Sequence, residues 1–369
     1  VTPKIVSGID DVYPRITLSS LVIEPAIEGN EADYEYPWYA YKNEYDPIDT
    51  LGREKVLDYV VGLPAGIYTL IFKVESKANK VCAYKSTRLE VSSQFGRGFF
   101  VLKEHDGVTD MDFIRDGQVN ADILSVVNGE GLAGGAVKGA FTAGGYSYEV
   151  TNPDNTTEVV KSQSAFFITS DEDMRVYDGE SMKMLARFGD AFMELPQVQK
   201  PQGVYACLYG QFTLNDGRLF CLTSVLNNVG KFGYPWVGNY DLSPNIMQGY
   251  TSSLAYDRAS KSFQLLNPLS TSPAPILPGF TGYDLLYMGH SEYMEGTPFY
   301  GYGIVKSPEG KHYLFGVMAP YNFQLLQNQE VPADFNVLEA KVFAVGGYGK
   351  DVIFFSPGDN TVGYYNFSN

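Results

Sequence analysis

Six segments of the sequence repeat one pattern, and this repeat is the feature that most constrains the fold. Each segment is an apolar strand, a turn of Asp, Glu, Gly, Ser or Asn, and a second strand that carries Tyr or Phe. Apolar runs separated by such turns predict β-hairpins. In chain order the segments are GFFVLKEHDGVTDMDFI (98–114), AFFITSDEDMRVYDG (165–179), GQFTLNDGRLFCLTS (210–224), SSLAYDRASKSFQLL (252–266), YGIVKSPEGKHYLFG (302–316) and VFAVGGYGKDVIFFS (342–356).

The spacing of the hairpins predicts a β-propeller. The last five recur at roughly 40–50 residues, a period typical of propeller blades with four strands each. We therefore expect residues 93–369 to form a propeller of six or seven blades, the last being incomplete or closed by a strand from residues 94–102. The first interval is longer, and its Gly- and Ala-rich segment, 128–145, is interpreted as a loop insertion. An ordinary meandering sandwich is the alternative.

A second all-β domain precedes the repeat. Residues 1–92 hold short strands broken by Pro and Gly, and the pattern changes near Ser92. Strands at this spacing predict an immunoglobulin-like sandwich with Trp38 in its core. Tyr68 follows a Pro-Ala-Gly turn and precedes alternating apolar residues, as does the tyrosine at the corner of such folds.

Composition agrees with an all-β chain and limits its partners. Aromatic residues make up 14% of the sequence and 38 of the 369 residues are Gly, which favours strands and turns over helices. The net charge of −16 opposes nucleic-acid binding. No stretch approaches the ~20 apolar residues of a membrane-spanning helix, so we expect no transmembrane span. The three cysteines, Cys82, Cys207 and Cys221, have no metal-site spacing and are expected to be buried free thiols.

Two motifs resemble a known family. They are the segment LPAGIY (63–68) and the junction GRGFFVLKEHDG (96–107) between the two domains. With the order of sandwich and propeller, they resemble the PKD-like family lipoproteins of Bacteroidetes, which are often encoded beside outer-membrane glycan-uptake systems. The resemblance implies export to the outer membrane or cell surface, with a lipid anchor in the untrimmed protein. It implies no molecular function.

The sequence carries no catalytic signature. It lacks the GxSxG motif of serine hydrolases, the HExxH motif of zinc proteases and a glycine-rich phosphate loop. His290 lies near Glu292 and Glu295, but a metal site there would need ligands from other strands. The acidic turn at 171–178 lacks the ligand spacing of a calcium loop. We therefore expect no metal and no cofactor, and whether the protein is an enzyme stays open.

Aromatic loops are the strongest sign of a ligand. The segments 231–250 and 277–303 place Tyr and Trp between Gly and Pro. Such side chains offer flat apolar area with a polar tip, which suits stacking on sugar rings. We expect Trp236 to present an open face; the alternative is that these rings pack between blades. The candidate ligand-binding residues are Tyr234, Trp236, Tyr240, Tyr250, Tyr283 and Tyr287.

Two classes of function are compatible with these patterns. The first is a non-catalytic cell-surface binding or adhesion protein that recognises glycan, or another host or cell-surface polymer, in a polysaccharide-uptake context. The second is a propeller-type glycoside hydrolase or polysaccharide lyase. A glycoside hydrolase usually needs a pair of carboxyl groups aimed at its substrate, and the sequence singles out no such pair.

Overall fold

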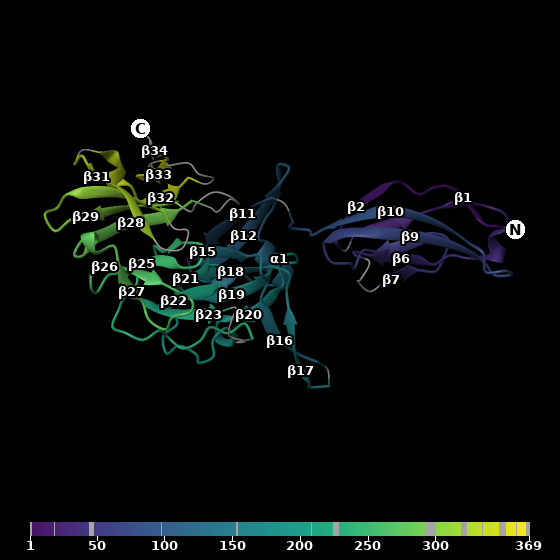
Figure 1. Ribbon diagram of the computed structural model, residues 1–369, viewed down its shortest axis with the longest axis horizontal. Coiled ribbons are helices and arrows are strands. Elements are labelled where there is room, and N and C mark those ends of the chain that lie inside the picture. The colour runs from purple at the N-terminus through teal and green to yellow at the C-terminus, as the bar shows by residue number, and fades with distance from the viewer. Residues whose placement is uncertain are drawn as a thin grey trace. The chain divides into compact units, whose positions relative to one another are not determined.

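The computed structural model shows an all-β chain divided into two compact units, Val1–Gly98 and Phe99–Asn369 (Figure 1). The structure describes residues 2–17, 19–43, 48–96, 98–152, 154–207, 209–223, 229–291, 300–318, 323–333, 335–346, 352–358 and 360–366. The boundary falls after the predicted seam at Ser92, because the last strand of the first unit ends there and a turn with a buried Phe95 follows.

The first unit holds one six-stranded sheet and two small ones. The large sheet has the order β2–β10–β9–β6–β7 with β5 also paired to β9, and the small sheets are β3–β8 and β1–β4. Neighbouring strands are antiparallel except β2 and β10, which are parallel. The elements are β1 (Lys4–Ser7), β2 (Val12–Ile16), β3 (Ser20–Ile23), β4 (Ala26–Glu28), η1 (Glu31–Asp33), β5 (Tyr34–Glu35), β6 (Trp38–Tyr41), β7 (Asp49–Gly52), β8 (Leu57–Val60), β9 (Gly66–Ser76) and β10 (Cys82–Ser92).

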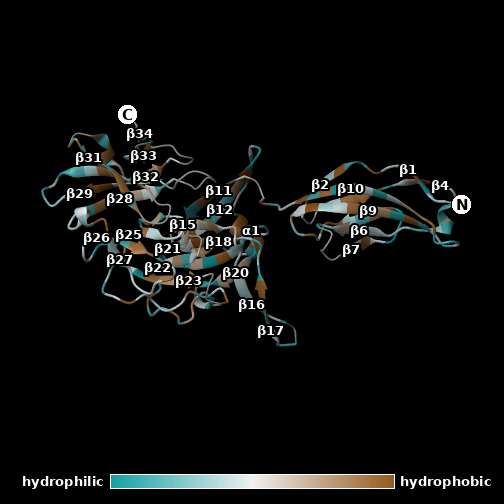
Figure 2. Cartoon of the chain, viewed as in Figure 1, coloured by the Kyte–Doolittle hydropathy of each residue, from teal (hydrophilic) through white to brown (hydrophobic). Residues whose placement is uncertain are grey.

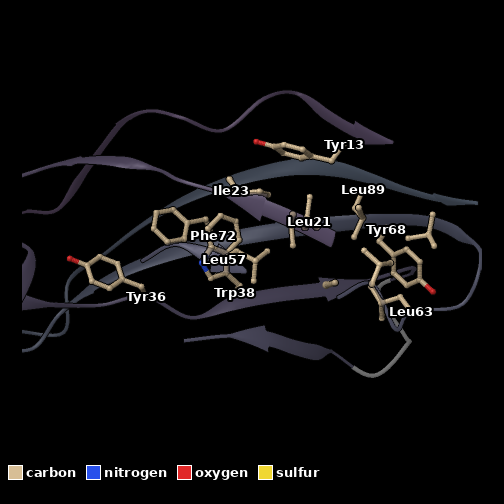
Figure 3. Packing of buried hydrophobic residues seen from close by; sticks show 14 of the residues in the cluster. Tyr13, Leu21, Ile23, Tyr36, Trp38, Leu57, Leu63, Tyr68, Phe72 and Leu89 are labelled. Atoms are coloured by element: carbon tan, nitrogen blue, oxygen red, sulfur yellow. The ribbon is translucent and has the colours of Figure 1, made fainter. Parts of the chain in front are cut away.

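Trp38 lies in the core of this unit, as predicted. Its side chain is fully buried, its ring centroid is 4.4 Å from that of Phe72 on β9, and its indole Nε1 donates to the Glu54 carbonyl at 3.0 Å. Leu21 of β3 and Leu57 of β8 belong to the same cluster, so the small sheet covers one face of the large one (Figure 3). This is the two-layer packing of a sandwich.

Tyr68 forms the expected corner. Its hydroxyl donates to the carbonyl of Pro64 at 2.8 Å, which ties the start of β9 to the turn before it. Residues along β9 then alternate between buried and partly buried, as in a strand with one face on a core. Both features of the first domain that the sequence predicted at single residues are therefore confirmed.

The second unit contains six successive antiparallel sheets among its described residues. Their orders are β11–β12–β13 with β14 on β12, β15–β18–β19–β20, β21–β22–β23, β24–β25–β26–β27, β28–β29–β30–β31 and β32–β33–β34, and a separate hairpin is formed by β16 and β17. The elements are β11 (Phe99–His105), β12 (Val108–Arg115), β13 (Gln118–Asn120), α1 (Ile123–Asn128), β14 (Leu132–Ala133), β15 (Ala136–Thr142), β16 (Ser147–Thr151), β17 (Thr157–Lys161), β18 (Ala165–Ser170), β19 (Met174–Asp178), β20 (Met184–Arg187), η2 (Phe188–Asp190), β21 (Pro201–Cys207), β22 (Gly210–Asn215), β23 (Arg218–Thr223), β24 (Met247–Gln248), β25 (Ser253–Asp257), β26 (Ser262–Leu266), β27 (Ala274–Ile276), η3 (Pro278–Phe280), β28 (Asp284–His290), β29 (Tyr300–Lys306), β30 (His312–Met318), β31 (Gln324–Val331), η4 (Asn336–Glu339), β32 (Val342–Val345), β33 (Val352–Ser356) and β34 (Gly363–Asn366).

All six predicted hairpins are present, one in each sheet. They are the antiparallel pairs β11–β12, β18–β19, β22–β23, β25–β26, β29–β30 and β32–β33. In the third, Asp216 and Gly217 have φ of 48° and 71°, which a two-residue hairpin turn requires. The turn sets Phe212 opposite Cys221, the register expected from the sequence.

The interpretation of 128–145 as a loop insertion is wrong. This segment contains β14 and the whole of β15, which is the first strand of the second sheet. The strand forms despite its small residues because β15 pairs with β18 and contacts β21, so tertiary packing and not local propensity decides it. The added segment that lengthens the first interval is the β16–β17 hairpin, which projects from the sheets (Figure 1).

Neighbouring sheets of the second unit pack in chain order. The first strands of the six sheets, β11, β15, β21, β24, β28 and β32, each contact the next. Apolar clusters fill the spaces between the second and third, third and fourth, fourth and fifth, and fifth and sixth sheets. Figure 2 shows hydrophobic residues alternating with hydrophilic ones in the strands. In the described residues β11 pairs with β12, so residues 94–102 are not seen to close the last sheet.

The three cysteines are free, as predicted, but only Cys221 is buried. Burial raises the pKa of the Cys221 thiol to about 12 and that of the partly buried Cys207 thiol to about 11, so both stay protonated at neutral pH. No helix in the described part of the chain is long and apolar enough to cross a membrane. Within the same residues, no group of His, Cys, Asp or Glu side chains is arranged to hold a metal ion.

Candidate functional site

A cavity of about 520 Å³ opens on the second unit beside the first aromatic segment. We call it the Tyr234 cavity. Its volume lies within the range of small-molecule binding sites, which is roughly 300–1,000 Å³. The cavity is lined by Glu194, Leu195, Pro196, Gln197, Val198, Asn215, Asp216, Arg218, Phe220, Tyr234 and Pro235.

Two segments that run side by side form its walls. Phe192 and Phe232 make a parallel bridge, in which the Phe232 amide donates to Ala191 at 2.8 Å and the Met193 amide donates to Phe232 at 2.9 Å. Beyond this bridge, residues 194–198 line the cavity from one segment and residues 234–235 from the other. The buried side chain of Phe220 on β23 also lines it.

Hydrogen bonds within the chain hold both walls. The amides of Gly233 and Trp236 donate to Cys221 and Leu219, so the aromatic segment follows the edge of β23. On the other wall the buried Asn215 side chain donates to the Val198 carbonyl at 2.8 Å and accepts from the Lys200 amide at 2.8 Å. The cavity is therefore preformed, which lowers the entropy cost of binding.

Tyr234 gives the cavity an exposed aromatic ring. Its side chain is 63% exposed, and Leu195 and Val198 on the opposite wall are also exposed. Charged groups, among them Asp216 and Arg218, lie at the end formed by the β22–β23 turn. An aromatic surface beside polar groups is the arrangement that binds sugar rings, since a sugar has apolar faces and hydroxyl edges.

The expectation of an open Trp236 face is wrong. The Trp236 side chain is 5% exposed and meets Phe212 edge-on at 5.5 Å between ring centroids. Its backbone bond to Leu219 turns the ring into the cluster between the third and fourth sheets. Arg218 secures this arrangement, because it donates to the Trp236 carbonyl at 2.9 Å and lies 4.0 Å from the Tyr240 ring.

The other four candidates also pack against protein. Tyr240 is 8% exposed, in the same cluster as Trp236. Tyr283 contacts the Phe280 and Tyr313 rings, and Tyr287 stacks on Phe343 at 4.6 Å, where burial raises the pKa of Tyr287 to about 12. Tyr250 is partly buried.

Of the six candidates, Tyr234 is the one that lines the cavity. Ligand binding by any of the six stays a prediction. Residues 292–299 of the second aromatic segment lie outside the described residues, as do Glu292 and Glu295 near His290.

Sequence reasoning missed the wall opposite Tyr234. Leu195 and Val198 belong to the connection FMELPQVQKPQG (192–203), in which apolar residues stand between prolines. That combination in a connection between hairpins is the signal for an exposed apolar surface. Arg218 gave no separate signal, because its role depends on carbonyls that only the folded chain brings to it.

Comparison with known proteins gives one family match. No curated protein matches the chain. Among solved structures, the chain is similar to the dihydro-heme d1 dehydrogenase NirN in complex with DHE (10% identity, TM-score 0.41, covering 80% of this chain and 59% of that one). It is also similar to the N-terminal domain of Nup159 (9% identity, TM-score 0.32, covering 61% and 63%). The chain thus spans less than two thirds of each, and scores this low bear on neither fold nor function. Residues 1–135, which include the first unit and the first sheet of the second, match the PKD-like family.

Proposed function

We propose that the protein is a non-catalytic cell-surface binding protein that recognises a neutral glycan in the Tyr234 cavity. The observation that carries this proposal is the cavity itself, which is lined by an exposed tyrosine, by exposed apolar side chains and by charged residues. A sugar ring would stack on Tyr234 and present its hydroxyl groups to the polar end. The acidic chain suits a neutral partner better than an anionic one.

The proposal includes the fold of the second unit and the location of the protein. We infer that the second unit is a β-propeller of six blades, since six antiparallel sheets follow one another and pack face to face in order. The match of residues 1–135 to the PKD-like family supports the PKD-like part of the resemblance. Export as a lipoprotein of Bacteroidetes is proposed from the resemblance alone. The proposed setting is the outer membrane of a cell that takes up polysaccharides, with attachment through a lipid anchor.

The test compares binding of the full chain and its Tyr234→Ala variant to neutral polysaccharides: starch, galactomannan, xyloglucan and mixed-linkage β-glucan. Binding is measured by retardation in gels that contain each polysaccharide, and by calorimetry with oligosaccharides of those that bind. Loss of the aromatic ring should weaken binding by about 1–3 kcal/mol, the usual cost of removing an aromatic anchor. The melting temperature should stay nearly unchanged because the ring is exposed.

Tyr84→Ala is the matched control. Tyr84 is also 63% exposed but belongs to the first unit, on β10. The Tyr84→Ala variant should bind each polysaccharide as tightly as the unmodified chain does. Equal weakening by both variants would show that the cavity is not the site, and absence of binding to all four polysaccharides would overturn the neutral-glycan proposal.

The enzymatic alternative has a defined test in the same cavity. Glu194 and Asp216 both line it, and two carboxyl groups are what a glycoside hydrolase requires. Incubation with the same polysaccharides should release no new reducing ends if the protein only binds. Release that Glu194→Gln abolishes would make the protein a hydrolase and replace the binding proposal.

A further inference from the structure

A second group of polar side chains lies on the first strands of successive sheets. Lys138 belongs to β15, Gln248 to β24 and His290 to β28, while β21 with Tyr205 and Ala206 runs between the first two. Lys138, Gln248 and His290 are each partly buried. We call these three residues the donor cluster. It is separate from the Tyr234 cavity, since none of the three lines that cavity.

Lys138 is a partly buried cation without a carboxylate partner. Its stem passes over Gly203, where a β-carbon would lie 3.0 Å from the Lys138 Cδ, and its Nζ is 4.8 Å from the centroid of the Tyr205 ring. No carboxylate among the described residues pairs with it, and burial lowers the pKa of its ammonium group. A desolvated ammonium group is unfavourable unless it is paired, so this position favours an anion.

Gln248 is held so that its amide NH₂ group faces His290. Its Oε1 accepts the Ala206 amide at 2.6 Å, and this bond fixes which end of the side-chain amide points to the imidazole. The Gln248 backbone amide donates to Nδ1 of His290 at 3.2 Å. A neutral imidazole whose Nδ1 accepts a hydrogen bond carries its proton on Nε2.

Two donors therefore face each other in the cluster. The Nε2 atoms of Gln248 and His290 lie 3.1 Å apart, and in this protonation state both bear hydrogen. Lys138 adds further N–H donors, since its Nζ lies against the ring of Tyr205, which precedes Ala206, the residue bonded to Gln248. Burial, and then the charge of Lys138, lowers the pKa of His290. A carboxylate has two oxygens that accept about four hydrogen bonds, and its negative charge would pair with the ammonium group of Lys138.

We propose that the donor cluster binds the carboxylate of a small acidic ligand, either a hexuronate or an amino-acid derivative. The ammonium group of Lys138 supplies the charge, and the two facing N–H groups of Gln248 and His290 each gain an acceptor. The net charge of −16 gives no long-range attraction for an anion, so recognition depends on these short-range contacts. We therefore expect the cluster to bind a carboxylate more tightly than its neutral analogue, because a hydroxyl or amide group has no negative charge to pair with Lys138.

The test follows the imidazole NMR signals of the chain's three histidines in histidine-labelled protein, with sodium glucuronate as the first probe. Glucuronate should shift the His290 signal, which the His290→Gln variant identifies, and leave His105 and His312 unchanged. Glucose is the neutral analogue and should shift none. N-acetylglycine and its neutral amide then distinguish an amino-acid carboxylate from an acidic sugar.

Two variants separate binding from folding. Lys138→Met keeps the stem over Gly203 but removes the charge, and should weaken carboxylate binding roughly 10- to 100-fold, as expected for a charged hydrogen bond. Lys183→Met removes an exposed lysine of the same unit and should have no effect. Gln248→Glu places a carboxylate inside the cluster, and should abolish binding while raising the pKa of His290.

Three results would overturn the proposal. The first is that neither carboxylate moves the His290 signal at millimolar concentration, and the second is that the neutral analogues move it equally. The third is that Lys138→Met binds as tightly as the unmodified chain. If Lys138→Met fails to fold, Gln248→Glu decides the question, because retained binding in that variant contradicts the site.

Discussion

At the scale of single residues, Trp236 shows how burial changes the meaning of an aromatic side chain. It packs on Phe212 in the cluster between the third and fourth sheets. Trp236→Ala should therefore open a core cavity and lower the free energy of unfolding by about 3–5 kcal/mol. Urea denaturation followed by circular dichroism measures this loss. Tyr234→Ala is the adjacent control and should cost little stability, since its ring is exposed; equal stability of the two variants would contradict the buried position of Trp236.

His290 predicts a pH dependence of stability. Burial, and then the charge of Lys138, lowers the pKa of His290 to about 4 in the folded chain, against about 6.5 when unfolded. Between these values the unfolded chain binds a proton that the folded chain does not, so stability falls as pH falls. The free energy of unfolding that depends on the neutral state of His290 is fully present above pH ~6.5. It is lost as the pH falls to ~4, and the loss amounts to about 3 kcal/mol.

The difference between the unmodified chain and His290→Gln isolates this contribution. The free energy of unfolding is measured for both proteins between pH 6.5 and pH 4.5. The unmodified chain should lose more of it on acidification, so the difference between the two proteins should change steadily across this interval. Lys138→Met removes the second cause of the shift and should reduce the difference. Parallel curves across that interval would show that His290 titrates normally in the folded state.

At the scale of secondary-structure elements, local chemistry predicted the hairpins and tertiary packing decided the rest. A turn such as Asp216-Gly217 fixes its own hairpin and register, so all six pairs were readable from the sequence. The first strand of the second sheet, β15, was not readable, because its small residues have weak strand propensity and its place depends on pairing with β18 and contact with β21. Lys138 was missed with it, since it stands in the segment interpreted as a loop.

In the candidate site, too, the sequence predicted the local features but not those that depend on tertiary contacts. The aromatic content of 231–250 pointed to Tyr234, but not to which rings face solvent. That choice depends on the bonds that tie the segment to the edge of β23, including Trp236 to Leu219. The opposite wall, 194–198, joins the site through the bridge between Phe192 and Phe232, a pairing that no local pattern encodes.

At the scale of the whole molecule, each unit has a hydrophobic core of its own and one of the chain's two tryptophans. Trp38 is in the core of the first unit and Trp236 in the second. Trp236→Phe therefore leaves a fluorescence reporter for the first unit, and Trp38→Phe leaves one for the second. Because a domain with its own core folds on its own, the two reporters should show separate urea transitions in the full chain.

The fragment 1–98 should fold alone and reproduce the transition that Trp38 reports in the Trp236→Phe chain. Residues 99–135 complete the PKD-like match, but β11 and β12 in this stretch pair within the first sheet of the second unit. Fragment 1–135 should therefore unfold at the same urea concentration as 1–98. Higher stability of 1–135 would place the first sheet with the first unit instead. Coincident transitions of both tryptophans, with 1–98 unfolded, would show that the two units form one cooperative structure.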